Sequence, residues 1–323
     1  MHEVKVLRQL LDDRLQNLDF PVQPANLYDP IRYMLAIGGK RMRPLLVLMG
    51  CELFNGDLSK AMNPALGVEV FHNFTLLHDD IMDNAPLRRT KQTVHEKWNV
   101  SVAILSGDAM YVKAVQLVMH TDEKHIRPLL DLFNKTALQV CEGQQLDMDF
   151  ESRKDVSLTD YLHMIELKTA VLLGCALQMG AISAGADHAS ALHLYETGRN
   201  LGIAFQIQDD FLDLYGNDEF GKKPGGDIIA NKKTFLLLKA LEKATVVQRD
   251  MIHAIIADKT INDAQLVQKV KTIFDALNVA QHTEEAMDHF YNKAMSELSA
   301  LNVVEANKQS LIALAQSLRI RVA

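Results

Sequence analysis

Two copies of the pattern Asp-Asp-x-x-Asp constrain this chain more than any other feature. They occupy residues 79–83 (DDIMD) and 209–213 (DDFLD), and each follows an apolar run that is typical of a helix. In a helix, the first and last Asp of each copy lie one turn apart on one face, where like charges repel. A single copy is ordinarily a solvated acidic helix face. Two copies, each within an apolar helix, instead predict helices that bind a cation.

Magnesium is the cation that this pattern favours. Mg²⁺ is usually bound by one or two protein carboxylates together with water and substrate phosphate oxygens. Because the two copies lie far apart in the chain, two separate helices could face each other across one site.

The remaining sequence predicts an all-α fold. The chain has 323 residues with only 16 Gly and 8 Pro, and helical periodicity runs nearly from end to end. No linker or low-complexity segment interrupts it, so we expect a single domain, residues 1–323, built as one large helical bundle. Breaks between helices are expected near residues 21–30, 54–64, 84–86, 120–128, 150–158, 185–190, 216–232 and 258–263.

Charge and cysteine usage exclude several classes of protein. The net charge of −7 argues against a nucleic-acid partner. The three cysteines, Cys51, Cys141 and Cys175, form no metal-binding spacing, which favours reduced thiols in a cytoplasmic protein. The most apolar stretch, residues 169–186, contains a glutamine and many small residues. We therefore expect it to be a buried core helix and expect no membrane span.

Basic residues cluster in three places, two of them directly after the acidic motifs. The clusters are residues 38–44 (GGKRMRP), Arg88 with Arg89, and Lys222, Lys223, Lys232 and Lys233. A double glycine lets a backbone approach an anion, and arginine forks match phosphate oxygens. Solvated surface charge would not explain why basic pairs follow both acidic motifs. Acidic clusters for a metal beside basic clusters for phosphate suggest a diphosphate substrate.

Three further polar residues are candidates for the site, and two of them also have a purely structural interpretation. His72 lies on the helical stripe that leads to Asp79, and a core histidine with a satisfied hydrogen bond fits it equally well. Gln206 precedes the second acidic motif by one turn. Lys168 is expected to open the most apolar helix, where a snorkelling lysine at a helix start is the simpler interpretation.

With these residues in view, the chain resembles the trans-type isoprenyl diphosphate synthases, the family of farnesyl and geranylgeranyl diphosphate synthases. The resemblance covers nearly the whole chain. Five elements follow the family order: residues 38–44; the first acidic motif with Arg88 and Arg89; residues 168–170; residues 205–213; and residues 221–222 followed by Lys232. It implies an isoprenoid-synthase bundle with a central active-site cavity, working as a homodimer on isopentenyl diphosphate and an allylic diphosphate.

The resemblance also implies a role for each motif residue. Asp79, Asp83 and Asp209 would bind three Mg²⁺ ions, while Asp80, Asp210 and Asp213 would orient water and the ligating carboxylates. The allylic diphosphate would be bound by Arg88, Lys168, Gln206 and Lys222, and isopentenyl diphosphate by Lys40, Arg43, His72, Arg89 and Lys232. Thr169 and Gln206 would place oxygen dipoles beside the developing allylic cation, and Lys168, Thr169 and Gln206 would form the catalytic group.

Two departures from the family pattern stand out. The family often has Gly-Lys-Pro-Thr after the arginine pair, and this chain has residues 90–93 (TKQT) there, so we expect a less tightly turned loop. Asn231 replaces a common glycine before Lys232. Neither departure removes a charged ligand.

Two other functions remain as alternatives. A class I terpene cyclase also ionises an allylic diphosphate with Mg²⁺, but it needs no isopentenyl site and usually carries a different second motif. A non-enzymatic partner subunit should have lost part of the acidic or basic motifs, and this chain keeps them.

Product length is expected to depend on side chains below Asp79 on the same helix. Thr75 is small and lies one turn below Asp79, Phe74 is bulky but set to one side, and Phe71 is a deeper stop. A lone aromatic five residues before the motif resembles the geranylgeranyl type. The expected product therefore has twenty carbons, with the fifteen-carbon farnesyl product as the alternative.

Overall fold

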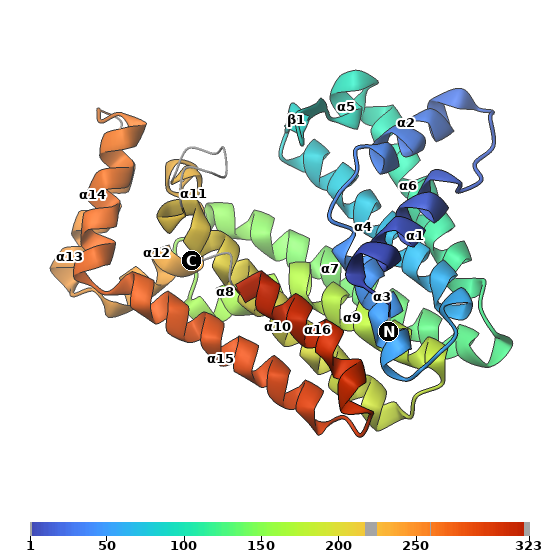
Figure 1. Ribbon diagram of the computed structural model, residues 1–323. Helices are drawn as coiled ribbons and strands as arrows, with labels where there is room; N and C mark the ends of the chain where they lie inside the picture. The colour runs from blue at the N-terminus through green and yellow to red at the C-terminus, as the bar shows by residue number, and fades with distance from the viewer. Residues whose placement is uncertain (1, 217–224, 259, 320–323) are drawn as a thin grey trace. The chain divides into compact units, whose positions relative to one another are not determined.

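A computed structural model of the chain describes residues 2–216, 225–258 and 260–319 and confirms the all-α fold (Figure 1). The chain divides into two compact units. Unit 1 comprises Met1–Asn134, Cys175–Tyr195 and Leu301–Leu311, and unit 2 comprises Lys135–Gly174, Glu196–Ala300 and Ile312–Ala323. Four helices, α7 (Glu123–Ser152), α9 (Val171–Ala184), α10 (His188–Tyr215) and α16 (Glu305–Arg319), contribute residues to both units.

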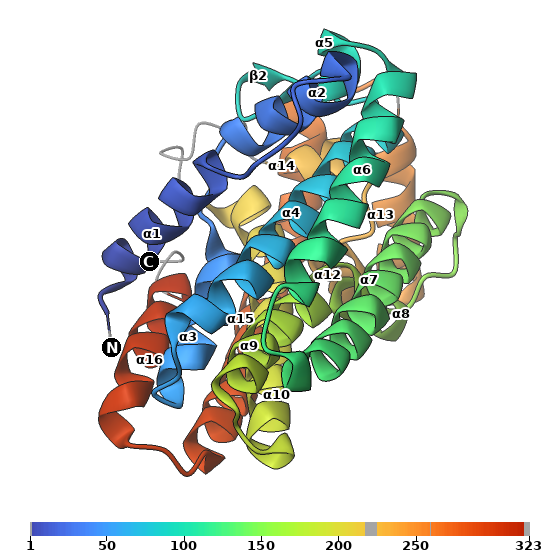
Figure 2. The ribbon, with the colours of Figure 1, turned by 90° about the vertical axis from the view of Figure 1, so that its right-hand side faces the viewer.

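Unit 1 is built around one long helix. Its elements are α1 (Val4–Gln16), α2 (Ala25–Ala36), α3 (Met42–Leu53), α4 (Leu58–Met82), β1 (Leu87–Arg88), β2 (Lys91–Gln92), α5 (Val94–Lys97) and α6 (Val100–Met119). Helix α4 packs against both α3 and α6, and Figure 2 shows α4 and α6 side by side. A methyl group at Gly67 would lie 2.9 Å from the Ala114 carbonyl oxygen, so this glycine lets α4 and α6 approach closely.

The segment after the first acidic motif is a tight hairpin. Strands β1 and β2 pair antiparallel, with Leu87 opposite Gln92, and only two residues connect them. Arg89 and Thr90 occupy this turn with φ angles of 50° and 68°. The expectation of a loosely turned loop is therefore wrong. The Tyr33 hydroxyl bonds to the Gln92 carbonyl oxygen at 2.7 Å and helps to hold the turn closed although it contains no glycine.

Unit 2 gathers further helices around α10. Its own elements are α8 (Leu158–Ile165), η1 (Glu166–Ala170), α11 (Gly226–Ile229), α12 (Phe235–Lys243), α13 (Val246–Ala257), α14 (Asp263–Ala276) and α15 (Val279–Ala300). Apolar side chains of α8, α10 and α12 form one core cluster that includes Ile165, Ile207 and Phe235. A second core cluster links α12, α13 and α14.

Helices α8 and α9 are joined by a π-helical turn rather than by a loop. This turn, η1, contains Lys168 and Thr169, so Lys168 lies inside a continuous helical run and not at a helix start. A methyl group at Gly143 would lie 2.2 Å from the Lys168 backbone nitrogen, and one at Gly202 would lie 2.6 Å from Ala170 Cα. Two glycines on neighbouring helices therefore make room for the wider turn. Single π-turns within α-helices are frequent at functional sites.

Three helices begin earlier than the prolines suggested. Pro30, Pro64 and Pro128 lie inside α2, α4 and α7, within the first seven residues of each helix. A proline in the second turn of a helix removes one backbone hydrogen bond. Pro30 and Pro64 are buried, so packing also favours the helical conformation there.

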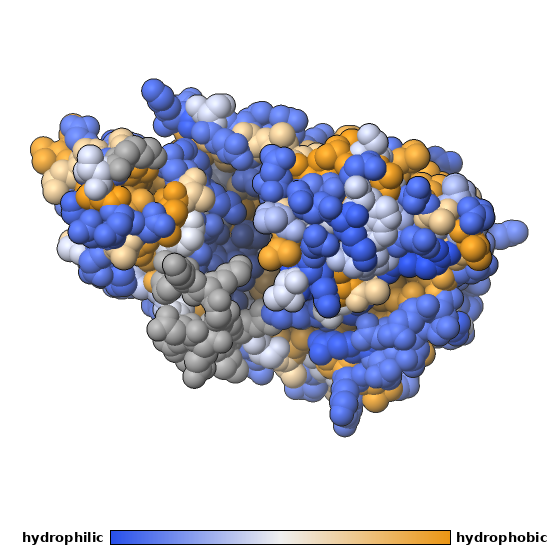
Figure 3. Space-filling view, turned by 90° about the horizontal axis from the view of Figure 1, so that it is seen from above, coloured by the Kyte–Doolittle hydropathy of each residue, from blue (hydrophilic) through white to orange (hydrophobic). Residues whose placement is uncertain are grey.

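Within the part of the chain that the structure describes, two helical runs are apolar enough in composition to cross a membrane. They are Val100–Met119 and Leu158–Ala184, and 78% of the most apolar window of Leu158–Ala184 is buried inside the protein. That burial is typical of a core helix, as expected for residues 169–186. The face seen from above in Figure 3 is largely hydrophilic, with apolar patches between polar side chains.

Candidate functional site

The first acidic motif ends α4 and is held by an arginine. Asp80 is buried, and its carboxylate receives the Arg88 Nε at 2.9 Å and Nη2 at 2.8 Å. Burial raises the pKa of the Asp80 carboxyl, and the hydrogen bonds from Arg88 oppose that rise. Arg88 Nη2 also lies 3.8 Å from the Asp79 carboxylate, while Asp83 is the exposed C-cap of α4. The pair of half-buried Arg88 and buried Asp80 therefore fixes the helix end from which Asp79 and Asp83 project.

A basic cluster gathers around His72, which lies two turns earlier on α4. Arg43 donates from Nη1 to His72 Nε2 at 3.0 Å. Because a guanidinium can only donate, Nε2 is the acceptor and the proton of the neutral imidazole is on Nδ1. A methyl group at Gly39 would lie 2.6 Å from Arg89 Nη1, so Arg89 rests directly against the glycine loop. The fold thus brings together Arg43, His72 and Arg89, and Lys40 is exposed on the same loop.

The charge state of this cluster follows from its burial. Desolvation, and then repulsion by Arg43 and Arg89, lowers the pKa of His72 well below its ordinary value. Desolvation also lowers the pKa of Arg43 to about 10, which leaves it charged at neutral pH. The buried Nε of Arg43 has no hydrogen-bond partner. A cluster of cations with a vacant donor is suited to bind a phosphate group.

The expected chain-length residues form part of an aromatic cluster. Phe71 is buried, with ring centroids 5.6 Å from Phe74 and 5.2 Å from Phe133. Phe74 also packs against Tyr111 of α6 at 5.7 Å and against His78 at 4.7 Å. The Thr75 hydroxyl bonds back to the His72 carbonyl oxygen at 2.8 Å, which leaves its methyl group as the outward surface.

In unit 2, the π-turn and α10 present a second set of polar groups. Lys168 forms an ion pair with Asp147 of α7 at 2.5 Å. Thr169 Oγ1 donates to Gln206 Oε1 at 3.3 Å, which joins the π-turn to α10. Thr169 and Gln206 are therefore paired with each other, whereas Lys168 is paired with Asp147.

The second acidic motif divides into residues with different environments. Asp209 is exposed. Asp210 is buried, and its Oδ2 accepts the Tyr161 hydroxyl at 2.5 Å and the Phe235 backbone N–H at 2.8 Å. Burial raises the pKa of Asp210 to about 7, although both hydrogen bonds lower it. Asp213 Oδ2 accepts the Asp227 backbone N–H at 3.0 Å, so this carboxylate joins α10 to the first turn of α11.

Two lysines that follow the second acidic motif were predicted to bind substrate, Lys222 and Lys232. Lys222 lies outside the residues that the structure describes. Lys232 is exposed, and its backbone N–H bonds to the Asp227 carbonyl oxygen at 2.9 Å. Lys232 belongs to unit 2, whereas Lys40, Arg43, His72 and Arg89 belong to unit 1.

The carboxylates suit a hard metal ion that shares its ligands with a substrate. Among residues 2–216, 225–258 and 260–319, no group of three or more His, Cys, Asp or Glu side chains forms a ready metal cage. Oxygen donors on helix ends, beside clustered cations, instead fit Mg²⁺ that is completed by phosphate oxygens and water.

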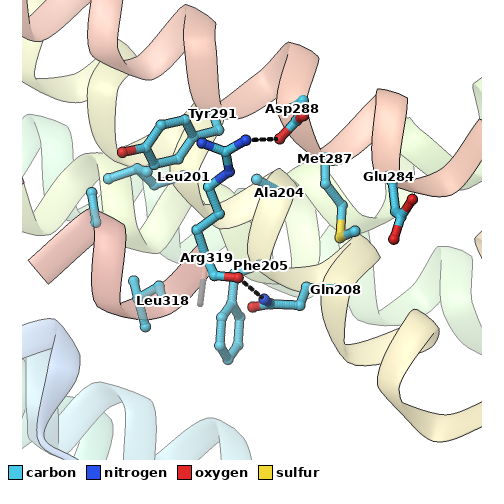
Figure 4. A pocket seen from close by; sticks show the side chains of 11 residues that line it. Leu201, Ala204, Phe205, Gln208, Glu284, Met287, Asp288, Tyr291, Leu318 and Arg319 are labelled. Carbon is cyan, nitrogen blue, oxygen red and sulfur yellow. Dashed lines mark hydrogen bonds and ion pairs between the residues drawn. The ribbon is translucent and has the colours of Figure 1, made fainter. Parts of the chain in front are cut away.

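A cavity of about 240 Å³ lies beside α10 within unit 2 (Figure 4). Phe205 and Gln208 line it from α10, and Arg319 reaches across it from the end of α16. Arg319 pairs with Asp288 at 2.8 Å and lies over the Tyr291 ring, and Gln208 donates to the Arg319 carbonyl oxygen at 3.2 Å. The end of α16 is therefore fastened to the residue that precedes the second acidic motif.

The sequence analysis missed several residues that contact the predicted site residues. Asp147, Tyr161 and Tyr111 contact Lys168, Asp210 and Phe74, respectively. Each lies on a helix without a recognised motif. Tyr161 was the most accessible to prediction, since a tyrosine on a strongly apolar helix needs a buried partner for its hydroxyl.

A model of the polyprenyl synthetase family matches residues 24–276, which include both acidic motifs and all three basic clusters. The chain belongs to the polyprenyl synthetase family. A geranylgeranyl diphosphate synthase of Methanosarcina mazei is 41% identical over 244 residues, which is 75% of each chain. A geranylfarnesyl diphosphate synthase of Natronomonas pharaonis is 37% identical over 301 residues, covering 87% of this chain and 86% of that one. A crystal structure of a geranylgeranyl pyrophosphate synthase matches with a TM-score of 0.94 and 45% identity over 100% of both chains. Family membership predicted from the motifs is thus confirmed.

Proposed function

We propose that this chain is a prenyltransferase that condenses isopentenyl diphosphate head-to-tail with an allylic diphosphate. The expected product is a short all-trans prenyl diphosphate, geranylgeranyl diphosphate. Similarity to geranylgeranyl diphosphate synthases over three quarters or more of the chain supports this function. The observation that carries it is the cluster of Arg43, His72 and Arg89, because a second anion site is what a condensing enzyme needs and a cyclase does not.

The basic cluster of unit 1 would hold isopentenyl diphosphate. Arg43 has a vacant buried Nε, and neutral His72 has its Nδ1 proton available for donation. Arg89 and Lys40 would neutralise the remaining charge, with Lys232 as a further cation. Fixing this diphosphate positions the double bond of the substrate for attack without any covalent step by the protein.

The residues of the acidic motifs would act on the allylic diphosphate. Asp79, Asp83 and Asp209 would hold Mg²⁺, for which we expect three ions. Mg²⁺, when bound, would neutralise the diphosphate and make it a better leaving group. Arg88, Lys168 and Lys222 would bind the same diphosphate oxygens and stabilise the charge that develops there.

The oxygen groups of the π-turn would act on the carbon skeleton. Thr169 and Gln206 present oxygens that would lie beside the allylic carbon as positive charge develops on it. The double bond of isopentenyl diphosphate then forms the new carbon–carbon bond, and loss of a proton to the released diphosphate completes the extension. Each step uses positioning and electrostatics rather than a protein nucleophile.

The whole chain is proposed to act as one synthase domain, residues 1–323, paired in a homodimer. Helix α6 supports a contact between two copies, since Ile104, Leu105 and Val112 are 44%, 59% and 56% exposed. Sedimentation of wild type and a Leu105→Glu variant would test this, and a monomeric wild type would contradict it.

Incubation with labelled isopentenyl diphosphate and dimethylallyl, geranyl or farnesyl diphosphate tests the function. Linear prenyl diphosphates and consumption of isopentenyl diphosphate are expected. Cyclic hydrocarbons without such consumption would indicate a terpene cyclase, and no turnover would indicate a partner subunit. In the same assay, Arg43→Ala should raise the KM for isopentenyl diphosphate more than that for the allylic substrate, and Arg88→Ala should do the reverse.

A further inference from the structure

The loop that carries the basic cluster contains one cation that faces away from any substrate. Arg41 stands between Lys40 and Arg43 in the sequence, yet it is buried. Its three guanidinium nitrogens each have a protein acceptor. Nη1 donates to Glu69 Oε1 at 2.6 Å, Nη2 to the Leu35 carbonyl oxygen at 2.8 Å and Nε to Asp12 Oδ1 at 3.2 Å.

Glu69 is the centre of this buried network. Its side chain and that of Arg41 are each only 5% exposed. Asn73 Nδ2 donates to Glu69 Oε1 at 3.0 Å, so the carboxylate oxygen that receives Arg41 is itself held by a second donor. Glu69 lies on α4 just before His72, and the network therefore ties the loop to the helix that carries the first acidic motif.

The backbone of the loop is strained at Arg41 and borders a cavity. Arg41 has a φ of 49°, an unfavourable region for a residue other than glycine, and Gly38 has a φ of 84°. A cavity of about 570 Å³ lies on the α1 side of the loop, lined by Gly38, Gly39 and Arg41. Because the loop borders this cavity, packing on the α1 side contributes little to holding Gly38, Gly39 and Lys40 in place.

We propose that Glu69 is a positioning residue for the isopentenyl diphosphate site, acting through Arg41 to hold the loop 38–43 against α4. This role rests on the proposed function of the site. Glu69 contacts no substrate. It fixes the backbone from which Lys40 and Arg43 project and against which Arg89 rests.

Electrostatics alone predicts the opposite effect, which makes the proposal testable by sign. The negative charge of Glu69 raises the pKa of both Arg43 and Arg89, against the lowering by burial. Removing that charge would strengthen the attraction of the cluster for a diphosphate if the loop kept its place. If Arg41 were itself a phosphate ligand, removing the charge of Glu69 would also free its guanidinium to bind the diphosphate, which again predicts tighter binding.

Steady-state kinetics of Glu69→Gln separates these effects. We expect the KM for isopentenyl diphosphate to rise about tenfold, with kcat and the allylic KM within about twofold of wild type. Arg41→Gln should raise the KM for isopentenyl diphosphate to a similar extent. Because both residues act through one contact, the double variant should have a KM no higher than that of the more impaired single variant. An unchanged or lowered KM in Glu69→Gln would overturn the proposal.

Glu196→Gln is the matched control. Arg199 is held by two carboxylates, as Arg41 is, with Glu196 Oε2 accepting from Nη2 at 2.6 Å and Glu166 Oε1 accepting from Nη1 at 2.9 Å. This variant should lower the melting temperature without raising the KM for isopentenyl diphosphate. A comparable KM rise in the control would show that the effect is general destabilisation, and would overturn the proposal.

A measurement without turnover keeps the proposal separate from the proposed function. Hydrogen exchange of the backbone amides of residues 38–43 should become at least about tenfold faster in Glu69→Gln and stay unchanged in Glu196→Gln. If wild type shows no prenyl transfer, the proposed function fails while this result still decides whether Glu69 holds the loop. Should Glu69→Gln not fold, Asp12→Asn removes a more exposed partner of Arg41 and should accelerate the same amides. Unchanged exchange in the folded variant would overturn the proposal.

Discussion

The hydroxyl of Tyr161 donates to Oδ2 of Asp210 at 2.5 Å, and the same oxygen accepts the Phe235 backbone N–H. One buried carboxylate oxygen therefore joins α8, α10 and the first residue of α12. The middle acid of the second motif thus serves as a structural junction in this unit.

Tyr161→Phe should destabilise the protein by about 1–3 kcal/mol, because it leaves a buried carboxylate short of one donor. Chemical denaturation followed by circular dichroism measures the loss. Tyr215→Phe is the control, since the Tyr215 hydroxyl bonds to Asp275 at an exposed position and should cost less. Equal losses in the two variants would contradict a special role for the buried junction.

Asp79→Ala and Asp209→Ala should each lower turnover by at least about 100-fold, since each removes a carboxylate that would hold the Mg²⁺ that offsets the diphosphate charge. The loss is measured with saturating substrates and MgCl₂. Wild-type activity should disappear in EDTA and return with added Mg²⁺. Activity that persists in EDTA would exclude the proposed role of the metal.

Thr75→Phe should shorten the product and Phe74→Ala should lengthen it, because both change the space one turn below Asp79. Tyr111 packs on Phe74 and is available to support its ring, so Phe74→Ala also exposes Tyr111. Chromatography of the dephosphorylated products measures chain length. Wild-type product distributions in both variants would place the floor elsewhere.

The neutral state of His72 predicts a pH dependence of stability in substrate-free protein. The folded-state pKa of His72 is lowered, so burial of the neutral imidazole costs no deprotonation above the unfolded value of 6.5. The free energy of unfolding therefore falls as the pH drops below that value. Compared with His72→Gln, wild type should lose up to about 1.4 kcal/mol in relative stability per pH unit below 6.5. Thermal unfolding between about pH 5.5 and about pH 7.5, roughly one unit either side of that value, tests it. A constant difference between the two proteins would argue against a buried neutral imidazole.

Thr90 and Asn231 both have positive φ, at 68° and 52°, where the resembling family commonly has glycine. A β-branched residue is strained in this region, whereas asparagine tolerates it. Thr90→Gly should therefore stabilise the protein by about 1 kcal/mol, and Asn231→Gly should have almost no effect. Melting temperatures compare the two, and a larger gain at Asn231 would be inconsistent with this account.

The parts of the fold that sequence predicted were those with a repeating physical signal. Leu7, Leu11 and Leu15 recur at helical spacing and are buried, and the acidic motifs lie on α4 and α10 as expected. The basic clusters were also recognisable, because they recur beside glycines and after the acidic motifs. The structure places two of these clusters in contact, with Gly39 packed against Arg89.

The missed features depend on contacts between segments distant in sequence. The π-turn at Lys168 exists because Gly143 and Gly202 leave room on two neighbouring helices, which no local pattern reveals. The burial of Arg41 depends on Glu69, and nothing in residues 38–44 distinguishes this cation from Lys40 and Arg43. Tertiary packing likewise places Pro64 inside α4.

Helix α4 carries Glu69, His72, Thr75 and Asp79 without a break, the residues proposed to anchor the loop, bind isopentenyl diphosphate, affect product length and hold Mg²⁺. Their spacing is therefore a property of helix geometry, about 1.5 Å per residue, and owes nothing to loop conformation. Point substitutions can alter one of these functions while the other distances stay constant. A single inserted residue would rotate everything beyond it by about 100° and disconnect them all. In such a chain, product length can therefore evolve by exchange of side chains at fixed positions along α4, and not by insertion or deletion of residues.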